Sequence, residues 1–294
     1  MLLETFLDNL RYERNLSERT VTEYRDDLKA FESFFKSLED DLSWETIDTD
    51  VARDWLVAMM NRGNKASSVQ RRLSALKTCY RFLYRRGLVA HDPVRSLTAP
   101  KKERVLPAFV REDDMNRLLD DSNMFDDTFD GRRDHLIVET FYETGLRLSE
   151  LVSLNLADIS LETQTIKVTG KGNKQRLVPF GNGLLHLINI YIGERAQLLV
   201  VDKEAFFVTK AGVRIPPYYV RRMVKAKLGL VTMQRKRSPH VLRHTFATSM
   251  LNHQADLLSV KELLGHEKLS TTEVDTHTTF EELKKAYSKA HPRA

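Results

Sequence analysis

Between residues 1 and 98, apolar side chains recur at helical spacing in four successive stretches, and few folds other than a helical bundle accommodate such a pattern. Ser17 stands at the N-cap position before the second stretch, and Asp48 has the same place before the third. Gly87 follows the fourth stretch as a stop signal. Residues 1–98 are therefore predicted to form a four-helix domain. The second stretch keeps its spacing through Val21, Tyr24, Leu28, Phe31 and Phe35.

A β-hairpin signal is the clearest feature of the later part of the chain. Two β-prone runs, 165–168 and 176–179, flank a turn with the sequence Gly-Lys-Gly-Asn-Lys. Helix-like stretches precede and follow this hairpin, including one that Gly145 is expected to end. We therefore expect a mainly α protein whose second domain, residues 109–294, is α+β with a small antiparallel sheet.

A short basic segment with a proline near each end separates the two predicted domains. Pro100 and Pro107 disfavour helix, so residues 99–108 are predicted to be an extended linker. Lys101 and Lys102 lie in this linker, where they are expected to follow a phosphate backbone and let the two domains close around a duplex.

The distribution of charge in the first domain indicates a polyanionic partner. The 294 residues carry a net charge of +5, which permits such a partner without requiring it. Residues 1–54 hold 7 Lys and Arg against 15 Asp and Glu, whereas residues 55–100 hold 9 against 1. This asymmetry suggests one face turned toward nucleic acid, although such a run is as often only a solvated face.

Cysteine content and hydropathy indicate the compartment. The single cysteine, Cys79, excludes an internal disulfide and fits a reducing cytoplasm. No apolar run approaches the length of a bilayer span, so no membrane partner is expected.

Basic side chains of the stretch from Pro239 onward form the strongest candidate site. His240 and Arg243 stand about one helical turn apart, and His266 follows an apolar stretch ending in Leu-Leu-Gly. Guanidinium and imidazole groups that converge in this way suit an anionic phosphate. His240 and His244 have the spacing of a zinc-binding helix, but no general-base Glu accompanies them and Arg243 would place a cation beside the ion. We therefore expect no metal.

Two further segments carry candidate residues, each with an ordinary structural alternative. Arg147 and Glu150 are three residues apart and would form a common surface ion pair. However, Arg147 stands at a predicted helix N-terminus, where a cation is misplaced unless an anion binds. Lys171 lies on the glycine-flanked hairpin turn, with Lys174 as its neighbour, and could equally be a solvated turn lysine.

The motifs at 240–245, 263–266 and 270–272 resemble tyrosine recombinases of the bacterial Xer type, and the first domain is similar to their core-binding domain. The resemblance implies metal-free phosphoryl transfer that needs no cofactor. By this resemblance Arg147 and Arg243 would bind the phosphate oxygens. His240 would assist deprotonation of the nucleophile, and His266 would hydrogen-bond the phosphate. Lys171 would protonate the leaving 5′-oxygen, and Glu150 would orient the basic groups.

The sequence departs from the family at the nucleophile. The family reads Thr-x-x-Tyr-Thr-His, whereas this chain has Asp275 in place of the tyrosine, between Thr272 and His277. The next tyrosine, Tyr287, lies several helical turns further on and is predicted to be a packing residue. The chain is therefore expected to bind DNA and to be deficient in cleavage.

The resemblance also implies partners and a role. These are double-stranded DNA with paired inverted half-sites, a homodimer and a tetrameric synapse on DNA, and further a paralogous recombinase and a DNA translocase of the FtsK type. Chromosome dimer resolution at the nucleoid in the cytoplasm is the implied role, and mobile-element integration is the runner-up. A non-catalytic architectural protein on the same fold, or an unrelated helical regulator, are the remaining alternatives. The expected DNA-binding side chains are Arg71, Arg72, Lys77, Lys101, Lys102, Lys174 and Arg237.

Overall fold

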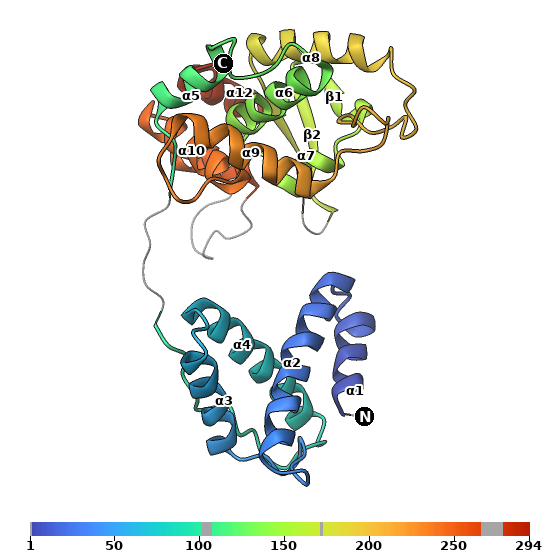
Figure 1. Cartoon of the computed structure of the whole chain (residues 1–294), viewed down its shortest axis with the longest axis vertical. Helices are drawn as coiled ribbons and strands as arrows, with labels where there is room; N and C mark the ends of the chain where they lie inside the picture. Colours follow the sequence, from blue (N-terminus) through green and yellow to red (C-terminus); the bar gives the residue numbers. More distant parts are fainter. Residues whose placement is uncertain (1, 102–107, 171–172, 266–278) are drawn as a thin grey trace. The chain divides into compact units, whose positions relative to one another are not determined.

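The computed structural model describes residues 2–101, 108–170, 173–265 and 279–294 (Figure 1). The chain divides into two compact units, Met1–Val105 and Leu106–Ala294. The described residues are mostly helical, with one small antiparallel sheet in the second unit, which confirms the fold class expected from the sequence. None of the helices in these ranges is both long and apolar enough to cross a lipid bilayer.

Local capping signals set the helix ends of the first unit. The Ser17 side chain accepts a hydrogen bond from the Thr20 N–H (3.3 Å), and Asp48 accepts from two backbone N–H groups at 2.9 Å, as their N-cap positions predicted. The first predicted helix differs from expectation because a π-helical turn interrupts it. The elements are α1 (Leu2–Asp8), the π turn η1 (Asn9–Glu13), α2 (Glu18–Leu38), α3 (Thr49–Asn61) and α4 (Ala66–Arg85).

Aromatic side chains from α2, α3 and α4 fill the core of the first unit. Phe31 packs against Trp44 and Trp55 with ring centroids 5.7 and 4.9 Å apart. Tyr80 is fully buried and donates its hydroxyl to the Trp44 carbonyl (3.1 Å). Cys79 lies in the same core with no exposed surface, and burial raises the pKa of its thiol.

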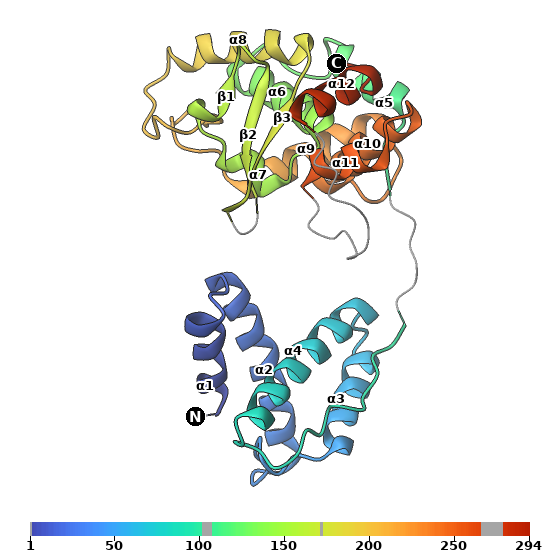
Figure 2. The same cartoon turned by 180° about the vertical axis from the view of Figure 1, so that it is seen from behind.

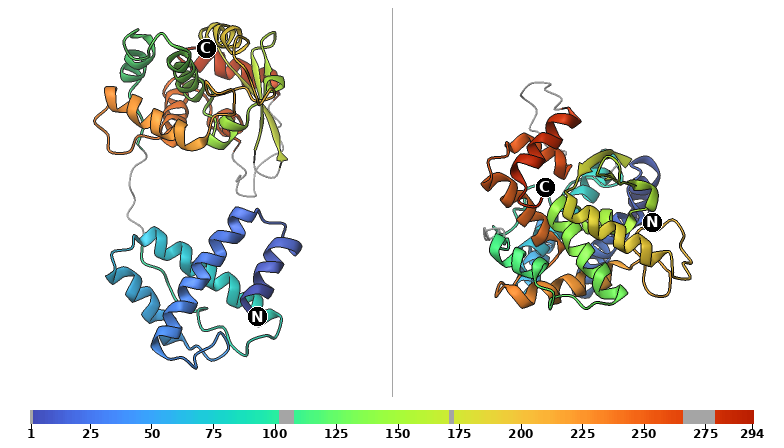
Figure 3. Two further views of the ribbon diagram at one scale, coloured as in Figure 1. Left: turned by 45° about the vertical axis from the view of Figure 1, so that its right-hand side comes forward. Right: turned by 90° about the horizontal axis from the view of Figure 1, so that it is seen from above.

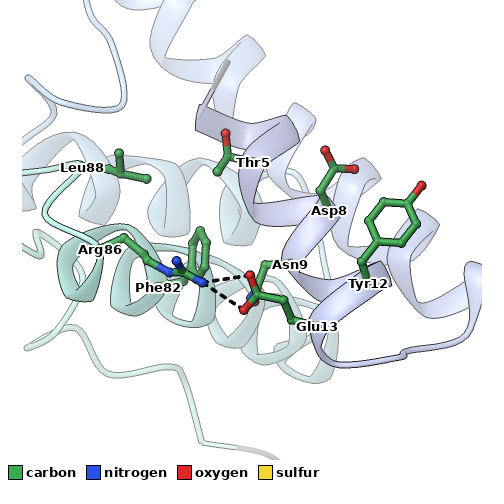
Figure 4. A pocket seen from close by; sticks show the side chains of 8 residues that line it. All are labelled: Thr5, Asp8, Asn9, Tyr12, Glu13, Phe82, Arg86 and Leu88. Atoms are coloured by element: carbon green, nitrogen blue, oxygen red, sulfur yellow. Dashed lines mark hydrogen bonds and ion pairs between the residues drawn. The ribbon is translucent and has the colours of Figure 1, made fainter.

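A surface pocket of about 530 Å³ separates α1 and η1 from the end of α4 (Figure 4). An ion pair spans this pocket, because Nη2 of Arg86 donates to both carboxylate oxygens of Glu13 at 2.8 and 2.9 Å. The pair links the π turn to the last helix of the unit, and because both side chains are more than half exposed, it offsets the charge of Arg86 only in part.

The second unit places a three-stranded antiparallel sheet beside a group of helices, as the left view of Figure 3 shows. The strand order is β1-β2-β3, and Thr169 pairs with Gln175 next to the turn, as the hairpin signal predicted. Gly145 ends α6, as expected, and Thr128 caps the start of that helix by accepting from the Gly131 N–H (3.1 Å). The elements are α5 (Glu112–Asp120), α6 (Phe129–Thr144), α7 (Leu148–Ser153), the 3-10 turn η2 (Leu156–Asp158), β1 (Ile159–Ser160), β2 (Thr165–Thr169), β3 (Gln175–Pro179), α8 (Asn182–Arg195), α9 (Pro217–Val231), α10 (Pro239–Asn252), α11 (Leu257–Leu264) and α12 (Phe280–Ala290).

The last helix, α12, packs on its own unit against α10, α11 and β3 (Figure 2). Tyr287 is buried, as predicted, and donates its hydroxyl to Oε2 of Glu143 (3.1 Å). The His291 ring stacks on that of Tyr287 and meets the Tyr142 ring edge-on, and Nε of Arg293 is 2.5 Å from a carboxylate oxygen of Glu139. Burial, together with the nearby Glu139 carboxylate, raises the pKa of Glu143 to about 8. The apolar stripe of α12 is therefore covered within one chain.

Candidate functional site

The site begins where the chain passes from α6 into α7. Gly145 ends α6 in the left-handed conformation (φ 60°), and Arg147 is the N-cap residue of α7. Glu150 accepts from the backbone N–H of Arg147 (2.8 Å) and from its Nη1 (2.7 Å). The sequence predicted that the positive charge of Arg147 is misplaced at a helix N-terminus, and Glu150 of the same helix partly offsets that charge.

Arg243 of α10 lies near Arg147 and Glu150, whose charges act on its guanidinium. Its side chain is largely buried, with Nη1 donating to the Gly145 carbonyl (2.7 Å) and Nη2 to the Leu264 carbonyl (2.6 Å). Burial, followed by repulsion from Arg147, lowers the pKa of Arg243 to about 10. Arg243 therefore stays charged at pH 7, in surroundings that do not favour a cation.

A third arginine, Arg176 of β3, belongs to the cluster and was not recognised in the sequence. Its Nη1 and Nη2 donate to the two oxygens of Glu150 at 3.0 and 2.9 Å, and its Nε donates to the Leu263 carbonyl (2.8 Å). Strand alternation places Arg176 on the same face as the buried Val178, which is the one local signal that it points inward.

The C-terminal end of α11 joins the three arginines. The carbonyls of Leu263, Leu264 and Gly265 accept from Arg176, Arg243 and Arg147, respectively, at 2.8, 2.6 and 3.1 Å. These are carbonyls that a helix end leaves without intrahelical partners, and the negative end of the helix dipole favours cations there. One short helix therefore sets the spacing of three guanidinium groups.

Glu150 is the carboxylate at the centre of this cluster and is 4% exposed. Burial acts to raise its pKa, but hydrogen bonds and charge from Arg176, followed by those from Arg147, lower the pKa to about 2. Glu150 is thus ionised throughout the physiological range.

The other predicted site residues divide into two groups. His240 lies one turn before Arg243 on α10 and is exposed, as is His244. Lys174 is exposed beside the hairpin turn. Lys171, His266 and Asp275 lie outside the described residues. The structure thus brings Arg147, Glu150 and Arg243 together and places His240 on the same helix as Arg243.

The DNA-binding candidates of the first unit are not all free cations. Arg71 pairs with both carboxylate oxygens of the buried Asp27, and Nε of Arg72 lies 3.5 Å from the same group. Lys77 donates to the Arg95 carbonyl (3.3 Å). Asp27 therefore orients two arginines at the surface of α4 while offsetting part of their charge.

Lys101 and Arg237, two of the remaining DNA-binding candidates, lie in loops. Lys101 is exposed, Lys102 lies outside the described residues, and Arg237 is half-buried between α9 and α10. Within the described ranges, no group of three His, Cys, Asp or Glu side chains is placed to hold a metal ion.

Gly145→Ala is expected to destabilise the second unit and disturb the site. A Cβ at this position would lie 2.5 Å from Cδ1 of Phe246 and 2.8 Å from Cδ2 of Leu264, in a left-handed backbone that alanine disfavours. Strain and overpacking together should cost roughly 2–4 kcal/mol of unfolding free energy. The matched control is Gly193→Ala in α8, where a Cβ meets nothing within 4 Å and a small stabilisation is expected. Thermal melts of both variants check this, and equal melting temperatures would contradict it.

Comparison with known proteins places both units in one family. The Phage integrase family model matches residues 108–282, and the model of the phage integrase N-terminal SAM-like domain matches residues 3–87. Tyrosine recombinase XerC of Chlorobaculum tepidum is 38% identical, covering 99% of this chain and 94% of that protein. XerC of Azotobacter vinelandii is 39% identical, covering 99% and 96%.

Solved structures show the same fold. XerH recombinase bound to its difH substrate has a TM-score of 0.71 at 24% identity, covering 97% of this chain and 83% of that one. A lambda integrase dimer bound to a core site has a TM-score of 0.70 at 17% identity, covering 93% and 98%.

Proposed function

The chain belongs to the phage integrase family and is a tyrosine recombinase of the Xer type, and from this we propose that it binds paired DNA half-sites and that Asp275 leaves it deficient in strand cleavage. The solved relatives named above are bound to DNA in their structures, which supports duplex DNA as the partner here. The relatives named XerC support chromosome dimer resolution in the cytoplasm as the role, with mobile-element integration as the second candidate.

One observation carries the proposal: three guanidinium groups gather at the end of α11. Arg147, Arg176 and Arg243 each donate to a carbonyl there, and Arg147 and Arg176 also bind Glu150. Burial and then repulsion from Arg147 lower the pKa of Arg243, so a bound anion would relieve an existing electrostatic cost. A phosphodiester fits this requirement, because its non-bridging oxygens accept parallel bonds from planar guanidinium groups.

The family mechanism then assigns each group a part. Arg147 and Arg243 would stabilise the negative charge that develops on the phosphate in the transition state. His240 would assist deprotonation of a tyrosine nucleophile, His266 would hydrogen-bond the phosphate, and Lys171 would protonate the leaving 5′-oxygen. A 3′-phosphotyrosine would conserve the bond energy, and no cofactor would be needed.

Asp275 interrupts this scheme at the covalent step. Its carboxylate is shorter than a phenol and faces a phosphate of like charge, and an acyl phosphate would be open to hydrolysis. A non-catalytic DNA-binding protein on the same fold remains the alternative. Retention of the five basic candidates favours the recombinase, because decay of function would not spare five residues and change one.

DNA binding by the unaltered chain is expected to be specific for inverted half-sites and strongly dependent on salt. Each phosphate contact should contribute a slope of roughly −0.9 in log K against log salt. Selection of bound duplexes from a randomised library, followed by affinity measurement over a range of salt concentrations, tests both expectations. A pool without an inverted repeat would favour the architectural alternative, and a flat salt response would contradict duplex binding by the basic residues.

A matched pair of variants sharpens this test. Lys77→Ala should reduce the salt slope by roughly one contact and weaken all duplexes alike. Glu23→Gln, which changes an exposed carboxylate on α2 that pairs with Arg19, should leave the slope unchanged.

A further inference from the structure

Arg176 differs from the other arginines of the site in how its donors are used. Nε, Nη1 and Nη2 each donate to an acceptor within the second unit, at 2.8, 3.0 and 2.9 Å, and the side chain is 14% exposed. A guanidinium held in this way has little surface for a substrate. Its effect on the site must therefore pass through Glu150 and the end of α11.

Arg147 contrasts with Arg176. It donates Nη1 to Glu150 and Nη2 to the Gly265 carbonyl, makes no hydrogen bond through Nε to any described residue, and is 34% exposed. Its guanidinium therefore keeps an open edge for an anion. Only one nitrogen of the Arg147 guanidinium meets Glu150, beside the backbone N–H of Arg147, whereas the guanidinium of Arg176 holds both carboxylate oxygens.

The different roles of Arg147 and Arg176 depend on their competition for the Glu150 carboxylate. A guanidinium and a carboxylate prefer two parallel hydrogen bonds, which are stronger than one. If Arg176 were absent, Arg147 would be free to rotate into that two-bond arrangement with Glu150. It would then lose the edge that it offers to a phosphate.

The end of α11 is tied into the same arrangement. Arg176 binds the Leu263 carbonyl two residues before Gly265, whose own carbonyl orients Arg147. Gly265 has φ +66°, and a Cβ there would lie 3.1 Å from Nη1 of Arg176. The close approach shows that the helix end and Arg176 are fitted to one another.

We infer that Arg176 is a positioning residue: by holding both oxygens of Glu150 and the Leu263 carbonyl, it keeps Arg147 from pairing fully with Glu150 and so aligned toward a bound phosphate. The inference rests on the proposed function, because the phosphate is the anion that this function supplies. Arg176 itself does not touch the substrate.

The test uses Arg176→Lys in the Asp275→Tyr background. Lysine keeps the charge, but its ammonium cannot bridge two carboxylate oxygens and a carbonyl in one plane. Single-turnover cleavage should fall by about 10- to 100-fold, as expected for a misplacement near 1 Å, while DNA affinity stays nearly unchanged. The matched control is Arg214→Lys. Like Arg176, Arg214 binds carbonyls at the end of a helix, in this case those of Val152 and Leu154 at the end of α7, but it does not contact Glu150. The control should cleave at nearly the parent rate.

A double-mutant cycle separates positioning from general destabilisation. If Arg176 acts through Glu150, then Arg176→Lys should cost little once Glu150→Gln is present. Fully additive losses would overturn the inference, as would equal losses for Arg176→Lys and Arg214→Lys.

A titration that needs no cleavage keeps this inference distinct from the proposed function. Carbon-13 NMR of the Glu150 carboxyl group, assigned with Glu150→Gln, should show that Arg147→Ala raises the Glu150 pKa more in the Arg176→Lys background than in the parent, because Arg147 then pairs with both carboxylate oxygens. An equal rise in the two backgrounds would overturn the role of Arg176 even in an active enzyme. Absence of cleavage by Asp275→Tyr, together with the larger rise in the Arg176→Lys background, would contradict the proposed function and leave the role of Arg176 standing.

Discussion

Asp275→Tyr is expected to convert a chain that forms no covalent complex with DNA into one that does. The phenol would extend beyond the reach of the aspartate carboxylate, and misplacement of a nucleophile by about 1 Å can cost on the order of 10²-fold in rate. It would also remove like-charge repulsion against the phosphate, and its phosphodiester adduct would resist water. Incubation with a nicked duplex that traps the intermediate, followed by denaturing electrophoresis, measures the adduct.

Two controls make this result specific. Asp275→Phe supplies the ring without the hydroxyl and should give no adduct. The double substitution Asp275→Tyr, Tyr287→Phe should still cleave, because Tyr287 is 1% exposed and its hydroxyl is bound to Glu143. Adduct formation by the unaltered chain, or its disappearance with the loss of Tyr287, would show that Asp275 is not at the nucleophile position.

Arg243→Ala in the Asp275→Tyr background is expected to lower the cleavage rate by about 10³-fold or more, since a guanidinium aimed at a phosphoryl transition state is worth that much. Most of the proposed DNA contacts lie elsewhere, so affinity should change far less. Single-turnover rates and dissociation constants on the same duplex separate the two quantities. Arg147→Ala should behave similarly.

Stability has to be measured alongside, because Arg243 also satisfies the carbonyls of Gly145 and Leu264. Arg243→Lys retains a charge, loses the planar fork, and should remain strongly impaired if the second guanidinium nitrogen matters. A variant that keeps its melting temperature and cleaves at the parent rate would show that Arg243 has no role in cleavage.

Features with a local cause were predictable from the sequence. Ser17 and Asp48 cap their helices through atoms two or three residues away, and Gly145 and Gly265 end helices because glycine readily adopts the left-handed backbone conformation found there. The hairpin follows from alternation and a glycine-rich turn. These interactions are contained within the window that a sequence pattern samples.

Features with distant partners were not predictable. Arg176 was assigned only to a strand, because its contacts lie 26 residues before it, at Glu150, and 87 residues after it, at Leu263. Asp27 and Arg71 are likewise 44 residues apart. The sequence likewise did not show that the charge of Arg147 is partly offset by the Gly265 carbonyl, because that carbonyl belongs to the end of a helix far along the chain.

The buried thiol of Cys79 has a practical consequence for following this protein in solution. The thiolate is the form of cysteine that adds to maleimide reagents, and Cys79 has no exposed surface and a raised pKa. One surface cysteine introduced into each unit would therefore take up donor and acceptor dyes while the native thiol stays in place. Fluorescence energy transfer between the dyes would then report the separation of the two units as duplex is added, with the aromatic core around Phe31 and Trp44 left intact.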